Sequence, residues 1–310
     1  MCKLKLFIIG NGFDIAHGMN TSYEDFREYL LSQCPKTVKL NGLLPQSKQL
    51  SDGAVFYPIN EVLVFIEDII SKVEGDKWSD LENTLGCLEY DEYLDDWIEY
   101  ESDNPFHEVY RNQEKVHVIF DLISKIPHYF NNWIRTISLE SVTQKKDFRK
   151  LINNRKDYFL TFNYTKTLED IYECQNVCHI HGVQGSDLLF GHGNSEDYCD
   201  EYMNSYIGSE GELSELHYKL RKNTEKAIKD NQNFFSGLSK RICEIYSYGF
   251  SFSDVDLVYI AKICQKLNTK KMKWYLNDYN CEPNSEEYCR LVRTLRDCKF
   301  KGEILTFHID

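Results

Sequence analysis

The chain has 310 residues, of which 42% are apolar and 27% are charged, with 16 glycines and 6 prolines. This composition is typical of a folded chain with a sizeable core, and it excludes disordered, collagen-like and low-complexity proteins. The formal net charge of −13 disfavours nucleic acid as a partner, because acidic side chains repel the phosphate backbone. The longest apolar runs are much shorter than the roughly 20 residues that a membrane-spanning helix needs, so no membrane association is expected.

The 11 cysteines include no CxxC pair, which favours free thiols in a reducing compartment and hence a cytoplasmic protein. Cys174 and Cys178 would supply only half of the four ligands of a structural zinc site. We therefore interpret them as buried core cysteines and expect no metal.

The amino-terminal residues predict a strand, a glycine loop and a helix. The apolar run 3–9 is too short for a signal peptide and ends in the loop 10–14. Thr21 and Glu24 then form a capping-box pattern for a helix that extends to about residue 31. This order is typical of the opening unit of a nucleotide-binding α/β domain.

A helical module is predicted to follow. Residues 34–53 contain glycines and prolines that indicate a surface loop. Apolar residues at helical spacing predict one helix over 62–73, a second near 81–88 and a long third helix over 119–137, with a kink at Pro127.

After residue 150 the pattern returns to strands that alternate with helices. A helix is expected near 168, a second near 255 with Ser253 and Asp256 as a capping box, and a polar lid or connector over 195–241. Strands are expected at 158–162, 177–180, 188–190, 242–248, 272–276 and 303–307. The sequence therefore predicts an α/β fold: a mostly parallel sheet with helices on both faces, built from residues 1–34 and 151–310, with the helical insertion at 35–150.

Four polar loops follow predicted strands, at residues 10–14, 163–165, 179–182 and 249–254. Because ligands of open α/β sheets bind beyond the carboxyl ends of the strands, these loops are expected to converge on one site. Two glycines in the first loop would let a pyrophosphate approach the backbone. The third glycine of the dehydrogenase fingerprint and the Walker lysine are both absent, so neither hydride transfer nor ATP hydrolysis is supported.

The motifs in and between these loops agree in order and spacing with a known family. They are Gly10-Asn11-Gly12-Phe13-Asp14, Trp78-Ser79-Asp80-Leu81-Glu82, Phe162-Asn163-Tyr164-Thr165, His179-Ile180-His181-Gly182, and Tyr248-Gly249-Phe250-Ser251 with Asp254 and Asp256. Up to about residue 280 the chain resembles the AbiH family of bacterial abortive-infection proteins. The resemblance implies defence against bacteriophage, in which an infected cell stops growing before the phage multiplies.

The same loops are distantly similar to the sirtuin-type NAD-binding fold, a Rossmann-like (sirtuin- or DHS-like) sheet. This resemblance implies NAD as the ligand, with Asn163 on the nicotinamide ribose and its attacking water, and His181 as general base. Asp14 is expected to stabilise positive charge on the ribose, and Gly249, Phe250 and Ser251 to hold the adenosine half. The residues expected to bind NAD are Gly10, Asn11, Gly12, Phe13, Thr161, Thr165, Gly182, Gly249 and Ser251.

The chain departs from the sirtuin pattern at three points. Thr165 stands where the sirtuin loop has aspartate, Asp14 stands where it has serine, and no four-cysteine zinc module is visible. These departures argue against protein deacylation more than against simple NAD⁺ hydrolysis at the nicotinamide–ribose bond.

Two other functions fit the sequence. His179, His181 and His192, with Asp14 or Asp254 as an oxygen ligand, would suit Zn²⁺ or Mn²⁺ in a nuclease or phosphodiesterase. His179 and His181 share a face only if their strand continues through both. The third possibility is a non-catalytic sensor that binds a nucleotide and signals through the helical module.

The predicted long helix suggests a form of regulation. Its apolar stripe from Ile119 to Ile137 must pack on the α/β domain, on other helices or on another subunit. From the third option we expect a homo-oligomer whose size or activity changes with a phage-derived trigger.

Overall fold

The computed structural model describes residues 4–34, 40, 43–75, 77–94, 106–279 and 281–309. The chain forms two compact units. The first, called the α/β unit, combines residues 1–21, 134–189 and 223–310. The second, called the helical unit, combines residues 22–133 and 190–222.

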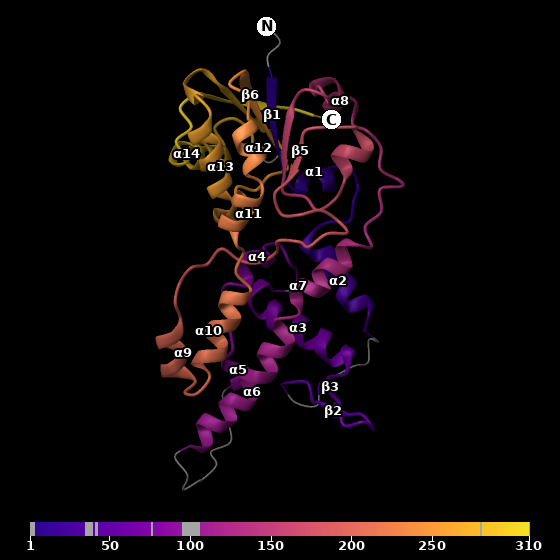
Figure 1. Cartoon of the computed structure of the whole chain (residues 1–310), viewed down its shortest axis with the longest axis vertical. Coiled ribbons are helices and arrows are strands. Elements are labelled where there is room, and N and C mark those ends of the chain that lie inside the picture. Colours follow the sequence, from indigo (N-terminus) through magenta and orange to yellow (C-terminus); the bar gives the residue numbers. More distant parts are fainter. Residues whose placement is uncertain are drawn as a thin grey trace. The chain divides into compact units, whose positions relative to one another are not determined.

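A six-stranded parallel sheet is the framework of the α/β unit (Figure 1). Its strands lie in the order β5-β4-β1-β6-β7-β8. Counted along the chain without the separate β2–β3 hairpin, this order is 3-2-1-4-5-6, which is that of doubly wound dinucleotide-binding sheets. The strands are β1 (Leu4–Ile9), β4 (Tyr158–Thr161), β5 (Val177–His179), β6 (Ile242–Tyr248), β7 (Lys273–Asn277) and β8 (Glu303–Phe307).

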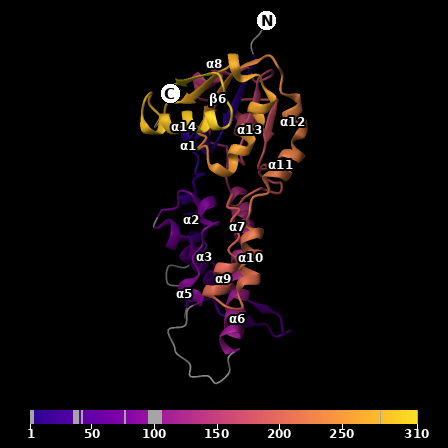
Figure 2. The same cartoon turned by 90° about the vertical axis from the view of Figure 1, so that its left-hand side faces the viewer.

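Helices cover both faces of this sheet. Phe7 and Ile9 of β1 pack in one core cluster with side chains from α1 (Asn11–Ala16) and α8 (Lys146–Leu151). Leu6 and Ile8 belong to the cluster on the other face, which α13 and α14 cover (Figure 2). The helices contributing to that face are α11 (Thr224–Asp230), α12 (Gln232–Gly237), α13 (Leu257–Lys266) and α14 (Glu286–Asp297). Short helical turns lie at Thr167–Ile171 (π), Asp254–Asp256 and Thr269–Lys271 (both 3₁₀).

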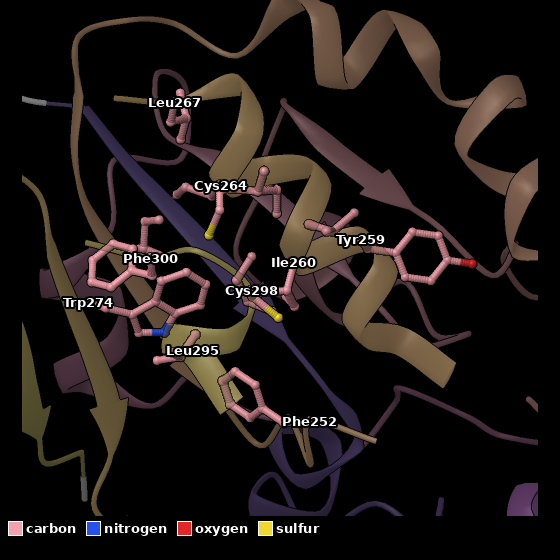
Figure 3. Close-up of a cluster of buried hydrophobic side chains, with 14 of the residues drawn as sticks. Phe252, Tyr259, Ile260, Cys264, Leu267, Trp274, Leu295, Cys298 and Phe300 are labelled. Carbon is pink, nitrogen blue, oxygen red and sulfur yellow. The ribbon is translucent and has the colours of Figure 1, made fainter. Parts of the chain in front are cut away.

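Burial on both faces explains why the first strand is a continuous apolar run. Leu6, Phe7, Ile8 and Ile9 are all 0% exposed, as expected for a central strand of a parallel sheet. On the α13 face, aromatic side chains fill the space between helices and sheet (Figure 3). Each fully buried side chain of β1 contributes about 1.5–3 kcal/mol of transfer free energy to folding.

The helical unit is built around aromatic contacts. Phe26 packs against Phe130 and Trp133, each with 5.3 Å between ring centroids. Its helices are α2 (Tyr23–Ser32), α3 (Ile59–Glu74), α4 (Leu81–Thr84), α5 (Asp91–Leu94), α6 (His107–Ile123), α7 (Ile126–Ile134), α9 (Cys199–Ser205) and α10 (Glu210–Lys219). The strands β2 (Lys48–Gln49) and β3 (Val55–Phe56) form an antiparallel hairpin.

The predicted fold class is confirmed, because the sheet is parallel and helices lie on both faces. Besides the long helix, four local predictions were wrong. Residues 188–190 form no strand, and the hairpin at 48–56 was not expected. The cap of α2 is Ser22, which pairs with Asp25 in a capping box, and Ser253 makes no side-chain cap. Of the predicted loop 34–53, residues 35–39 and 41–42 lie outside the described residues.

The predicted long helix is two helices, because α6 ends at Ile123 and α7 begins at Ile126. Pro127 stands in the first turn of α7, where its missing N–H costs nothing, so it starts a helix instead of kinking one. The apolar side chains of this stripe, such as Ile119 and Phe130, are buried within the chain itself. The expected homo-oligomer therefore stays a prediction. In the part of the chain that the structure describes, no helix combines the length and apolarity needed to cross a membrane.

Candidate functional site

The loops singled out from the sequence meet at the carboxyl edge of the parallel sheet. β1 leads into α1, which carries Asp14; β4 leads to Asn163; β5 ends at His179; and β6 leads to Gly249. In a 3-2-1-4-5-6 sheet, the chain reverses its direction of travel between β1 and β6, and ligands bind beside this switch point.

The glycines at the switch point pack the β1 and β6 loops directly against each other. The Gly10 N–H donates to the Tyr248 carbonyl (3.0 Å), and the Gly12 N–H donates to the Gly249 carbonyl (2.9 Å). A Cβ on Gly249 would lie 2.1 Å from the Phe13 nitrogen, a clash that only glycine avoids. The amides of Gly10 and Gly12 are therefore committed to the partner loop, and their role in binding a pyrophosphate stays a prediction.

This packing makes a stability prediction with an internal control. Gly249 and Gly18 both have positive φ angles, +63° and +75°, but a Cβ on Gly18 would meet nothing within 4 Å. Gly18→Ala is expected to cost only the backbone penalty of about 1–2 kcal/mol, whereas Gly249→Ala must also separate the two loops. We expect a markedly lower urea midpoint for Gly249→Ala. Equal midpoints for the two variants would contradict the loop contact.

The other predicted ligands in the first loop have contacts inside the α/β unit. Asn11 Nδ2 donates to the Thr21 carbonyl (2.6 Å), and the Phe13 ring is fully buried in the core cluster of Phe7. Thr161 Oγ1 accepts the Asn163 N–H (3.1 Å). These contacts shape the loops, and the binding role of each residue stays a prediction.

Asp14 is the centre of a buried polar group that we call the Asp14 cluster, made of Asp14, Asn163, Thr165 and Thr167. Thr165 Oγ1 donates to Asp14 Oδ2 (2.5 Å) and Thr167 Oγ1 donates to Asp14 Oδ1 (2.9 Å). Burial raises the pKa of the Asp14 carboxyl to about 6, against the opposing effect of these hydrogen bonds and of His179. The cluster therefore holds a carboxylate that titrates close to neutral pH.

Asn163 places a buried side-chain amide beside the Asp14 carboxylate. The residue is 5% exposed, and neither its side-chain nitrogen nor its side-chain oxygen has a hydrogen-bond partner of normal geometry among the described residues. Its proximity lowers the pKa of Asp14, but the two side chains fall short of a well-formed hydrogen bond. An unsatisfied buried amide costs about 1–3 kcal/mol, so we expect a water molecule or a ligand group to complete its hydrogen bonds.

The two histidines of the third loop have different partners, because β5 ends at His179 and the alternation of faces ends with it. His179 Nδ1 lies 3.0 Å from the Asn163 carbonyl, and its Nε2 lies 2.7 Å from Glu169 Oε1. His181 is instead 3.2 Å from Asp256 Oδ1, against the rings of Phe162 and Tyr259. The histidine that contacts the Asn163 backbone is therefore His179, and the role of His181 as general base stays a prediction.

Two further predicted residues complete the β5 and β6 loops. Gly182 has a φ angle of +85°, and a Cβ there would lie 2.4 Å from the Asp187 carbonyl oxygen, so glycine is required where the chain turns away. The Ser251 carbonyl accepts a hydrogen bond from Arg290 Nη2 (3.2 Å).

A cavity of about 1130 Å³ lies beyond the carboxyl ends of β6, β7 and β8. Of the predicted NAD-binding residues, Gly12 and Gly249 line it, together with Phe250. Its wall also carries aromatic and carboxylate side chains, including Tyr279 and Asp278. A concave, largely apolar site with a few polar groups is typical of a small-molecule pocket.

The sequence comparison decides the family. A family model described as bacteriophage abortive infection AbiH matches residues 6–278. The chain belongs to the AbiH family. Searches of the curated proteins and of the solved structures find no match to this AbiH chain.

The metal-ligand set of the alternative function does not assemble in this AbiH protein. Among the described residues, no three His, Cys, Asp or Glu side chains come together as metal ligands. His192 lies in the helical unit, where its Nε2 donates to the His217 carbonyl (2.9 Å) and burial lowers its pKa to about 4. Cys174 and Cys178 are free buried thiols, and burial raises the pKa of each to about 12.

The AbiH motif at residues 78–82 contributes a buried ion pair to the helical unit. Lys222 Nζ lies 2.7 Å from Glu82 Oε1 and 2.8 Å from Glu82 Oε2, with the two side chains 0% and 10% exposed. The next turn is fixed by Asn194, whose Nδ2 donates to the Gly86 carbonyl (2.8 Å). The motif therefore has a structural role within its own unit.

Removing one partner of this pair is expected to destabilise the protein strongly. Lys222→Met leaves the Glu82 carboxylate buried without its cation, at a cost of about 3–5 kcal/mol. The double variant Glu82→Gln/Lys222→Met should recover most of that loss in urea unfolding. A single variant as stable as the wild type would show that the pair contributes little.

Sequence reasoning missed the roles of Thr167, Glu169 and Asp256. The sequence pattern predicts Asp256 as part of a helix cap, not as the partner of His181, and it predicts no role for Thr167 or Glu169. A usable signal was present, because Thr165, Thr167 and Glu169 alternate directly after Asn163 in a segment that follows a buried strand. The five-residue π-helical turn that carries Thr167 and Glu169 has no such signal in the sequence.

Proposed function

We propose that this protein protects bacteria against phage by hydrolysing NAD⁺ at the bond between nicotinamide and ribose. AbiH family membership supports the role in abortive infection. The observation that carries the chemistry is the pairing of a buried carboxylate with a buried amide that has no partner of normal geometry, at the carboxyl edge of a dinucleotide-type sheet.

The reaction needs little from the protein beyond charge stabilisation and positioning. The C–N bond to ribose C1′ breaks, and its electron pair leaves with neutral nicotinamide. Water adds to C1′, giving ADP-ribose and a proton. The Asp14 carboxylate stabilises the positive charge that develops on the ribose, as carboxylates do in glycoside hydrolysis. Asn163 holds the ribose or the attacking water through its amide.

The topology of the sheet supports one placement of the dinucleotide in this proposal. The ribose that reacts lies on the β1–β4 half, at the Asp14 cluster, and the adenosine half lies in the cavity beside Gly249 and Phe250. His181, which pairs with Asp256, remains the predicted proton acceptor.

Incubation of purified protein with NAD⁺, followed by chromatography of the products, tests this function. We expect equal amounts of nicotinamide and ADP-ribose, and no loss of activity in EDTA. Tight retention of intact NAD⁺ would favour the non-catalytic sensor. Cleavage of phosphodiesters that EDTA abolishes and Mn²⁺ or Zn²⁺ restores would favour the nuclease.

The acidity of Asp14 predicts the pH dependence of the reaction. With a pKa near 6, Asp14 is a carboxylate above that pH and a neutral acid below it. The value of kcat/KM should therefore fall tenfold per pH unit on the acidic side of about pH 6. A rate that stays constant from pH 7 to pH 5 would exclude the carboxylate role.

A further inference from the structure

The ring of His179 is anchored at both nitrogens. Nδ1 lies 3.0 Å from the Asn163 carbonyl oxygen, and Nε2 lies 2.7 Å from Glu169 Oε1. The side chain is only 12% exposed. A ring held at both ends and enclosed in this way has one orientation.

The chemistry of the two partners fixes the protons. A carbonyl oxygen only accepts, so Nδ1 of His179 carries a hydrogen and donates it to Asn163. The Nε2–Glu169 contact then requires a second proton between those two atoms, which gives a charge-assisted hydrogen bond. Glu169 is therefore needed for the orientation in which His179 supports Asn163.

One π-helical turn connects this pair to the Asp14 cluster. The turn Thr167–Ile171 supplies Thr167, which donates to Asp14 Oδ1, and Glu169, which contacts His179. π-Helical turns are rare and often occur at functional sites. Here the turn places both contacts on the side of the sheet where Asp14 and Asn163 meet.

We propose that Glu169 and His179 are a positioning pair for the reaction. Glu169 holds the His179 ring, and the ring fixes the backbone of Asn163. The side-chain amide of Asn163 then meets the substrate beside Asp14. The inference rests on the proposed NAD⁺ hydrolysis, because the two residues keep Asn163 in position for that reaction. Neither residue touches the substrate, so each acts through Asn163.

Glu169→Gln tests the proposal. Asp170→Asn is its matched control on the same turn, because Asp170 is exposed to solvent. We expect Glu169→Gln to lower kcat on the order of 10- to 100-fold with KM within about twofold. Asp170→Asn should match the wild type, and circular dichroism should show that both variants are folded.

The outcomes separate the pair from the reaction. If the wild type consumes NAD⁺ and Glu169→Gln keeps its kcat, the positioning pair is overturned and the proposed function stands. If the wild type consumes no NAD⁺, the proposed function fails. Nitrogen-15 spectra of His179 in the wild type and phage plating of Glu169→Gln then judge the pair. We expect a doubly protonated ring in the wild type and lost protection in Glu169→Gln. A singly protonated wild-type ring, or full protection by Glu169→Gln, would overturn the pair.

Discussion

Asp14→Asn is expected to stabilise the folded protein at pH 7.5 while abolishing its protection against phage. Burial raises the pKa of Asp14 from 3.8 to about 6, so the folded state binds this proton more tightly than the unfolded state. The stabilisation from that proton is present below pH 3.8 and is lost as the pH rises through about 6. At pH 7.5 the protein bears the cost of a buried carboxylate, at most about 3 kcal/mol at 1.36 kcal/mol per pKa unit.

Asparagine removes this cost and keeps the shape of the side chain. Its oxygen can still accept from Thr165 or Thr167, whose hydroxyls lie 2.5 and 2.9 Å from the carboxylate oxygens. Urea unfolding of both proteins at pH 7.5 and pH 4 measures the effect. The gain in unfolding free energy should be largest at pH 7.5 and close to zero at pH 4. A variant that is less stable than the wild type at both pH values would contradict the free-energy cost of the buried Asp14 carboxylate.

Asn163→Ala is expected to lower the rate of NAD⁺ hydrolysis by on the order of 10²–10³, the usual effect of removing one preorganised polar group from a site. Its effect on stability should be small, because the Asn163 side chain has no hydrogen bond of normal geometry to lose among the described residues. Activity is measured by release of nicotinamide, and stability by the urea midpoint.

Asn176→Ala is the matched control, since Asn176 Nδ2 donates to the carbonyls of Arg155 and Asp157 (3.3 and 3.2 Å). This variant should lose some stability and keep full activity. If Asn163→Ala instead lost stability and kept activity, Asn163 would be a structural residue and the site would lie elsewhere.

The strands and the fold class were predictable because their cause is local. An apolar run such as Leu6–Ile9 is typical of a strand buried on both faces, and the polar residues after each strand mark its carboxyl end. The gathering of Asp14 and Asn163 follows from the same rule, since parallel strands end at one edge. The Asp14 cluster was therefore within reach of the sequence, apart from Thr167.

The partners of the two histidines were not predictable, because they depend on the residue at which β5 ends. With the strand ending at His179, that side chain meets Glu169 and Asn163, whereas His181 meets Asp256. One more strand residue would have changed these contacts, and sequence patterns place strand ends only to within a few residues. The missed hairpin at 48–56 has a similar cause, since strands of two exposed residues leave no apolar pattern.

The NAD⁺ content of infected cells tests the proposed function most directly. Cells that carry the wild-type protein, Asn163→Ala or no protein are infected with a phage against which the wild type protects, and NAD⁺ is measured until lysis. We predict that NAD⁺ falls sharply before lysis only in cells with the wild-type protein, together with a rise in nicotinamide and ADP-ribose. Full protection by the wild type with an unchanged NAD⁺ level would contradict the proposed reaction.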